Sequence, residues 1–193
     1  MSRGLSIFET SLVNMVFFFA LFVFEIPTGA LADVFGRKLS FVLAGITTAL
    51  GFFFYYISQS FWGFVLAEAT IAIGSTLASG AFQAWLVDKL KYHDYQGKLN
   101  KVFSHEQMLD GVATIVGGVI GAYLGKFNLA WPWLAGAIGM SLVAIAAQVL
   151  MKEEYFVRQE FSWRQGWQAT KRVVKDSWQY GVKSKAVRFL ILI

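Results

Sequence analysis

The sequence contains no cysteine and only two prolines, and charged residues make up 15% of its 193 positions. Without cysteine, the chain has no disulfide, no thiolate metal ligand and no thiol nucleophile. Soluble domains carry about 25% charged residues. The low charge, the 56% of hydrophobic residues and a mean hydropathy of +0.54 therefore argue against a soluble enzyme. The composition indicates a multi-span helical membrane protein.

Five apolar runs are long enough to cross or nearly cross a bilayer, at residues 11–32, 39–57, 62–87, 108–124 and 129–151. At about 1.5 Å per residue they cover roughly 25 to 39 Å, compared with a hydrocarbon core of about 30 Å. The runs lack period-two alternation and are too long for barrel strands, so we expect helices. The predicted fold is all-α, a polytopic helical membrane protein with about five transmembrane helices.

Lysine and arginine divide unequally between the two sides of these runs. Fifteen lie in the links 33–38 and 88–107 and in the tail from residue 152, whereas only Arg3 and Lys126 lie on the other side. This split follows the positive-inside rule. It predicts a multi-pass protein of the plasma or inner membrane, with the basic side and the tail in the cytoplasm. The net charge of +5 is then a topology signal, and we expect no nucleic-acid partner.

The orientation also bears on the two ends of the sequence. The first run would enter from the outside, so we expect a further span before Met1; a secretory signal peptide is the alternative. Residues 186–193 resemble the start of another span. We therefore expect an incomplete N-terminal transmembrane half at 1–151, a cytoplasmic linker at 152–185 and a truncated further span at 186–193.

The predicted linker carries tryptophans with helical spacing. Trp163, Trp167, Val174 and Trp178 fall on one helical face, and basic residues fall elsewhere. This pattern suits an amphipathic helix lying in the cytoplasmic interface. An ordinary packed linker helix is an equal alternative.

The most distinctive segment is the short link between the first two runs. Gly36 can adopt the positive φ that a chain reversal requires, while Asp33 ends one helix and Arg37 and Lys38 begin the next. A carboxylate at such a helix end needs a partner, either Arg37 or the N-terminus of a neighbouring helix. A pairing made in one conformation and broken in another would act as a latch. The alternative is a tight turn with topology-setting charges.

This segment, from Gly29 to Lys38, resembles the loop between spans two and three of the Major Facilitator Superfamily, usually Gly-x-Leu-Ala-Asp-Arg-x-Gly-Arg-Lys. Val34 departs from the pattern, since a base is usual there. Residues 24–29 and 79–88 resemble a drug-efflux-like bacterial branch. The resemblance implies twelve spans in two halves built from inverted three-helix repeats, of which this chain holds spans two to six.

The resemblance also implies a mechanism. It implies alternating access, in which the two halves rock about a site at the midplane of the membrane. Gly29, Asp33, Gly36, Arg37 and Lys38 would belong to a conformational latch with the other half. Asp88, at the end of span four, would join that latch.

The third run carries polar residues on one side. At about 100° per residue, Ser75, Ser79 and Gln83 fall on the side of Glu68. In lipid such a stripe must face protein or a water-filled cavity, and the resemblance implies that this span lines the cavity. These residues are therefore candidates for the substrate or proton pathway. Helix packing by small residues is the alternative for Ser75 and Ser79.

Glu25 is an ionisable group within the first run and a candidate for proton or cation handling. A structural hydrogen bond beside Pro27, where a helix loses a donor, is the alternative. Gln83 stands where the efflux-like branch often has an acid, which leaves proton coupling to Glu25 or Glu68.

The fourth run contains Gly117, Gly121 and Gly125 at four-residue spacing, which should let another helix approach closely. Exporters of the superfamily often combine a glycine-rich motif with a proline in this span. The proline is missing here, which weakens the case for export.

The sequence thus predicts a secondary active transporter of a small solute, with proton-coupled efflux of drug-like compounds favoured. Uptake of a metabolite or sugar within the same superfamily is one alternative, and a non-transporting membrane interaction protein is another. We expect no enzyme activity, no catalytic residue, no metal and no cofactor. The expected partners are a small-molecule substrate, the lipid bilayer, protons and the remainder of the transporter chain.

Overall fold

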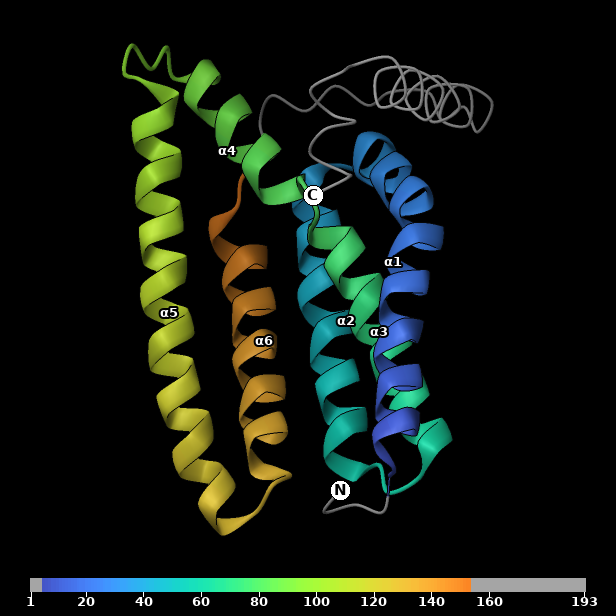
Figure 1. Ribbon diagram of the computed structural model, residues 1–193. Coiled ribbons are helices and arrows are strands. Elements are labelled where there is room, and N and C mark those ends of the chain that lie inside the picture. Colours follow the sequence, from blue (N-terminus) through green and yellow to red (C-terminus); the bar gives the residue numbers. More distant parts are fainter. Residues whose placement is uncertain (1–4, 154–193) are drawn as a thin grey trace, which may run out of the picture. The chain divides into compact units, whose positions relative to one another are not determined.

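The computed structural model describes residues 5–153 of the protein, and this part is helical throughout, without a β-strand (Figure 1). The helices are α1 (Ile7–Phe35), α2 (Arg37–Ile57), α3 (Phe61–Ala78), α4 (Ala81–Tyr92), α5 (Leu99–Phe127) and α6 (Trp131–Leu150). They provide five candidate membrane spans, because α3 and α4 together count as one. The all-α polytopic fold is confirmed. Residues 154–185 of the predicted linker and the predicted span at 186–193 lie outside the described residues.

The largest differences from the sequence prediction are in the third and fourth runs. The predicted run 62–87 is interrupted at Ser79 and Gly80, where Gly80 adopts a left-handed conformation with a φ of 69°. The helix predicted at 108–124 begins much earlier, at Leu99. Polar residues occupy its first turns, which is why hydrophobicity alone placed its start too late.

The helix α2 is the centre of the described part. It packs against α3 on one side and α6 on the other, while α1 packs mainly on α3 and α5 mainly on α6. Small residues allow the close approach: a Cβ added to Gly45 of α2 would lie 2.9 Å from the Cβ of Ala144 in α6. Helices associate within lipid chiefly through such van der Waals contact.

The glycines of α5 do not make equally close contacts with the other described helices. A Cβ added to Gly117 would meet nothing within 4 Å, and one at Gly121 or Gly125 would meet only Pro132, at 3.9 or 3.8 Å. No residue of α5 is buried within the described part. The close helix approach seen in the structure therefore occurs elsewhere, and the packing role of Gly117, Gly121 and Gly125 stays a prediction.

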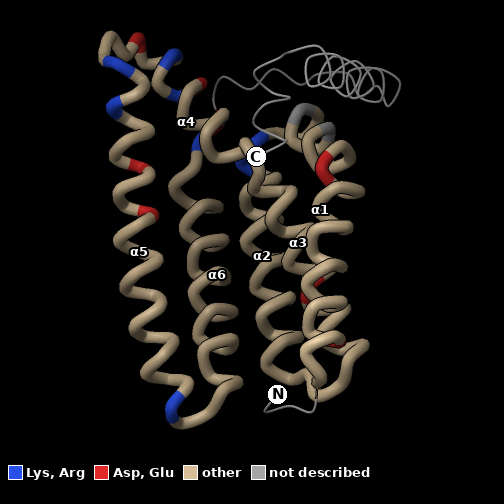
Figure 2. The backbone as a smooth tube through the Cα atoms, viewed as in Figure 1, with Lys and Arg blue, Asp and Glu red and all other residues tan. Residues whose placement is uncertain are grey.

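The described lysines and arginines gather at one end of the helices (Figure 2). Here α1 turns into α2, and α4 leads towards α5; we call this end the basic end. Lys126, in the last turn of α5, lies at the opposite end. Near the basic end α1 bends over (Figure 1). Pro27 lies within this helix and lacks the amide hydrogen that a regular helix needs, which accounts for the bend.

Candidate functional site

The turn between α1 and α2 consists of a single residue, Gly36. Its φ of 100° and ψ of 152° are readily adopted only by glycine. The Gly36 amide donates to the Ala32 carbonyl at 3.1 Å and so ends α1. The Gly36 carbonyl accepts from the Ser40 amide at 3.2 Å and so begins α2. One residue therefore reverses the chain, and it supplies no side chain to cap α2.

The cap for α2 comes from Glu153, which follows the end of α6. Its Oε1 accepts a hydrogen bond from the Arg37 amide at 2.7 Å. A Cβ at Gly36 would lie 2.5 Å from Glu153 Oε2, so the glycine also makes room for the carboxylate. A carboxylate at a helix N-terminus is favourable because it satisfies unpaired amides and complements the helix dipole.

The Arg37 side chain binds α4. Its Nη1 forms an ion pair with Asp88 and also donates to the Ala84 carbonyl at 2.7 Å. The side chains of Arg37 and Asp88 are 28% and 35% exposed, so water reaches the pair in part. Arg37 thus connects α2 to α4 through its side chain and to the end of α6 through its amide.

Aromatic side chains support α4 in the same place. Trp85 Nε1 donates to the Lys152 carbonyl at 3.1 Å. The Phe82 ring lies 5.4 Å from that of Phe41 in α2 and 6.0 Å from that of Trp85. The helix α4 therefore rests on α2 and on the segment that follows α6.

A second polar cluster lies at the break between α3 and α4. Ser79 Oγ donates to Glu25 Oε1 of α1 at 3.0 Å. Ser40 Oγ of α2 donates to the Leu77 carbonyl at 2.8 Å, and Ser40 is completely buried. We call Glu25, Ser40, Leu77, Ser79 and Gly80 the helix-break cluster. It joins two residues predicted separately for the transport pathway, Glu25 and Ser79.

The other residues of the predicted polar stripe lie apart from this cluster. Glu68 Oε1 accepts from the Tyr55 hydroxyl of α2 at 2.7 Å, and the Tyr55 ring stacks on Trp133 of α6 at 4.1 Å. Ser75 is partly buried and Gln83 is exposed. The stripe therefore contributes to two interfaces, since Glu68 bonds α2 whereas Ser79 bonds α1.

Comparison with known proteins decides the family. The family model of the Major Facilitator Superfamily matches residues 2–193, almost the whole chain. The chain belongs to the Major Facilitator Superfamily. This confirms the resemblance based on the Gly36 turn, and members of the family are membrane transporters. No solved structure is significantly similar to the chain.

The chain is also similar to three curated proteins with different names. The uncharacterized MFS-type transporter YxaM of Bacillus subtilis is 27% identical over 78% of this chain and 37% of its own length. The multidrug resistance protein MdtH of Photorhabdus laumondii is 28% identical over 77% of this chain and 35% of its own length. The sugar carrier protein C of Ricinus communis is 23% identical over 79% of this chain and 28% of its own length. The chain thus covers about a third of the length of these relatives.

The remaining predicted latch residues lie around the Gly36 turn. Gly29 lies in α1, where a Cβ would meet nothing within 4 Å. Lys38 is half-buried in the first turn of α2. Asp33 lies in the last turn of α1, and its side chain is outside the described part. The structure therefore joins Arg37 to Asp88, and the predicted contacts of Asp33 remain predictions.

The sequence reasoning missed several residues that the structure brings into these sites. Glu153 is an acidic residue shortly after an apolar run, at the basic end. Its position could have indicated a partner for the segment that contains Arg37. Ser40 is a hydroxyl directly before an apolar stretch of α2. Tyr55 carried no signal, because tyrosine near the end of a span usually belongs to the interfacial belt.

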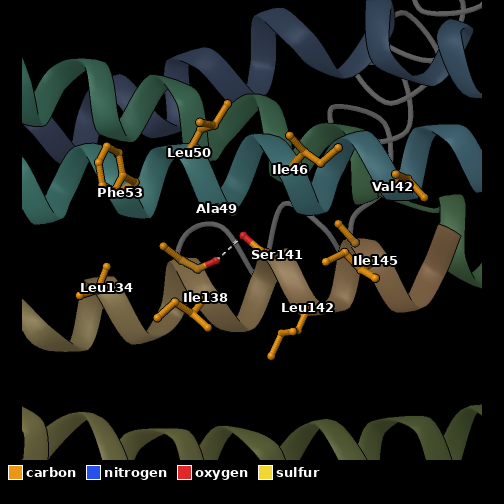
Figure 3. A pocket seen from close by; sticks show the side chains of 12 residues that line it. Val42, Ile46, Ala49, Leu50, Phe53, Leu134, Ile138, Ser141, Leu142 and Ile145 are labelled. Carbon is orange, nitrogen blue, oxygen red and sulfur yellow. Dashed lines mark hydrogen bonds between the residues drawn. The ribbon is translucent and has the colours of Figure 1, made fainter. Parts of the chain in front are cut away.

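A separate groove of about 560 Å³ lies between α2 and α6 (Figure 3). Its walls are apolar and include Ile46 and Phe53 of α2 and Ile138 and Ile145 of α6. The one hydroxyl in its wall, Ser141, donates to the Ala137 carbonyl within α6 at 2.8 Å. The groove includes none of the predicted polar residues, so its chemistry suits an acyl chain better than a polar solute.

Proposed function

We propose that this protein is part of a secondary active transporter that moves a small solute by alternating access. The observation that carries the proposal is the ion pair between Arg37 and Asp88, beside the Gly36 turn. It holds α2 and α4 together with polar, partly exposed groups. Such contacts are individually weak, which lets them form in one conformation and open in another.

The Glu153 cap supports the same role. Arg37 touches Asp88 with its guanidinium and Glu153 with its amide, so one residue connects three segments of the basic end. A rotation of α4 relative to α2 would change the contact with Asp88, and a rotation of α6 relative to α2 would change the contact with Glu153. Asp33 and Gly29 of α1 and Lys38 of α2 are proposed to belong to the same latch, through contacts with the rest of the transporter. The lysine and arginine distribution supports a cytoplasmic basic end in the plasma or inner membrane.

Proton-coupled efflux of drug-like compounds is the favoured activity. It is supported by the similarity to a multidrug resistance protein and by two carboxylates within the spans, Glu25 and Glu68. Ionisable groups inside transmembrane segments commonly mark proton pathways. Ser75, Ser79 and Gln83 would line the same pathway. The similarity to a sugar carrier supports a second candidate, uptake of a sugar or metabolite.

The test uses the complete gene product reconstituted into vesicles, with fluorescent cationic dyes and radiolabelled sugars as substrates. The expected result is dye transport driven by a pH gradient, reduced at least tenfold in R37Q and D88N. Two variants, K101Q and D110N, likewise replace a charged side chain by a neutral amide at exposed positions of α5 and should retain full activity. Sugar transport without dye transport would favour the uptake candidate. Absence of all solute transport in a correctly inserted protein would refute the proposal and favour a non-transporting interaction protein.

A further inference from the structure

The boundary between α3 and α4 is an interruption within one apolar run. No proline enforces it, since the chain's two prolines are Pro27 and Pro132. The interruption depends on Gly80, whose left-handed φ of 69° costs glycine little. Glycine also adopts helical angles, so a continuous helix is accessible to the same sequence. The surroundings of the break therefore decide between a bent and a straight form.

Two side chains from two different helices stabilise the bent form. In a continuous helix the Leu77 carbonyl would accept from the amide four residues later. In the bent form Ser40 Oγ donates to that carbonyl, at 2.8 Å. At the break itself, Ser79 Oγ donates to Glu25 Oε1 at 3.0 Å. The break is thus held from α2 by a neutral hydroxyl and from α1 by an ionisable carboxyl.

The contact with Glu25 depends on its charge. An ionised carboxylate is a pure acceptor, and hydrogen bonds to charged groups are about twice as strong as bonds between neutral groups. Protonation of Glu25 therefore weakens its hold on Ser79. The difference between charged and neutral bonds corresponds to a roughly fivefold to tenfold change in the ratio of the two forms.

The position of α4 converts this change into a larger movement. Asp88, which binds Arg37, lies two turns beyond the break on the same helix. Asp88 is about 12 Å from Gly80 at 1.5 Å per residue. A rotation of roughly 20° at Gly80 would move Asp88 by about 4 Å over this length. A movement of that size is enough to separate a hydrogen-bonded ion pair.

We infer that Glu25 is a proton-binding group whose charge sets the bend at Gly80 and, through α4, the pairing of Arg37 with Asp88. The ionised form of Glu25 holds the bend and the pair. The protonated form releases Ser79 and favours the straight form, in which α4 moves away from Arg37. The value of this coupling for solute movement rests on the proposed transport function, whereas the hinge itself can be measured without a substrate.

Other ionisable groups on the helices near Glu25 could contribute to a pH response. On α3, Glu68 is bonded to Tyr55. On α2, Arg37 is bonded to Asp88 of α4, and Lys38 lies in the same turn. On α1 itself, Asp33 lies at the basic end, with its side chain outside the described part, and Glu9 lies at the other end, capping Ser6. Matched variants are therefore needed to assign the response.

The experiment measures the hinge by electron spin resonance distances in the complete gene product. The 193 residues contain no cysteine. With any cysteine elsewhere in the gene product replaced by serine, labels are placed at K91C in α4 and L150C in α6, both exposed. Distances are recorded in lipid vesicles across the range of pH in which carboxyl groups titrate. The wild type should show two distance populations whose ratio changes fivefold to tenfold with pH. E25Q should show the low-pH distribution at every pH.

Three further variants separate coupling from a structural effect. S79A should lose the response, while S79T, which keeps the hydroxyl, should retain it. E9Q, the same substitution near the other end of α1, should behave like the wild type. An unchanged pH response in E25Q or S79A would overturn the inference, as would a single pH-independent distance in the wild type.

Transport by the same variants distinguishes the inference from the proposed function. If the spin-label distances change with pH in the wild type but not in E25Q, and transport does not depend on the proton gradient, the inference is supported and proton coupling is refuted. If transport is driven by the proton gradient but the spin-label distances respond to pH equally in the wild type and E25Q, the proposed function is supported and the inference is overturned.

Discussion

The ion pair between Arg37 and Asp88 allows a quantitative test of the latch. In D88N the side chain keeps its shape but loses its charge, while the bond from Arg37 to the Ala84 carbonyl at 2.7 Å can persist. Exposed ion pairs contribute about 0.2 to 1 kcal/mol, and hydrogen bonds to charged groups contribute about 1.5 to 3 kcal/mol. With side chains 28% and 35% exposed, we expect about 1 to 2 kcal/mol.

That energy corresponds to a roughly fivefold to thirtyfold change in the ratio of paired to released α4. The spin labels at Lys91 and Leu150 measure this ratio directly at neutral pH. D88N should enlarge the released population by that factor, and R37Q should do the same or more, because it also removes the bond to Ala84. The D110N variant, with the same substitution on α5, should leave the ratio unchanged.

A double-mutant cycle completes this test. If the pair holds α4, the combined R37Q and D88N variant should lose less than the sum of the single changes, because each single change already breaks the contact. Fully additive effects, or released populations unchanged in both single variants, would refute the reasoning. Swapping the charges, as R37D with D88R, should restore part of the paired population only if the interaction is electrostatic.

Three stability predictions can be checked by thermal unfolding of the purified protein in detergent. G36A should destabilise the protein by about 1 to 3 kcal/mol, because alanine is strained at a φ of 100° and its Cβ would displace the capping carboxylate; an unchanged melting temperature would contradict this account of the turn. G45A should cost about 1 to 3 kcal/mol by forcing α2 away from α6, whereas G118A, whose Cβ meets nothing within 4 Å, should be neutral or slightly stabilising. S40A should cost about 1 to 2 kcal/mol by removing a buried donor from the Leu77 carbonyl, and S40T, which keeps the hydroxyl, should cost less than S40A.

The helices could be predicted because lipid imposes a simple rule. Backbone groups must be paired inside the bilayer, so long apolar runs become helices, and all five predicted spans are present. The turn at Gly36 was predictable for a related reason, since few residues can reverse the chain between adjacent spans. Polar helix ends follow no such rule, which explains why α5 began earlier than its apolar run.

The contacts within the candidate sites were less predictable. The pairing of Arg37 with Asp88 brings together residues 51 positions apart, and the Glu153 cap spans 116 positions. Helical spacing shows which residues share a face, but not which neighbouring helix that face meets. The break at Gly80 was missed for another reason: glycine permits both a bent and a straight chain, and the side chains that bond the break, Ser40 and Glu25, come from other helices.

The origin of the α2 cap has a consequence for biosynthesis. The amide of Arg37 is capped by the carboxylate of Glu153, which lies 116 residues further along the chain and is synthesised later. At about 5 to 20 residues per second, ribosomes need on the order of 10 s to produce it. Throughout that interval the first turn of α2 must be satisfied by water or lipid headgroups. The N-terminus of α2 is therefore capped only after α6 has been synthesised. The described helices can reach their final packing only when the ribosome has passed Glu153.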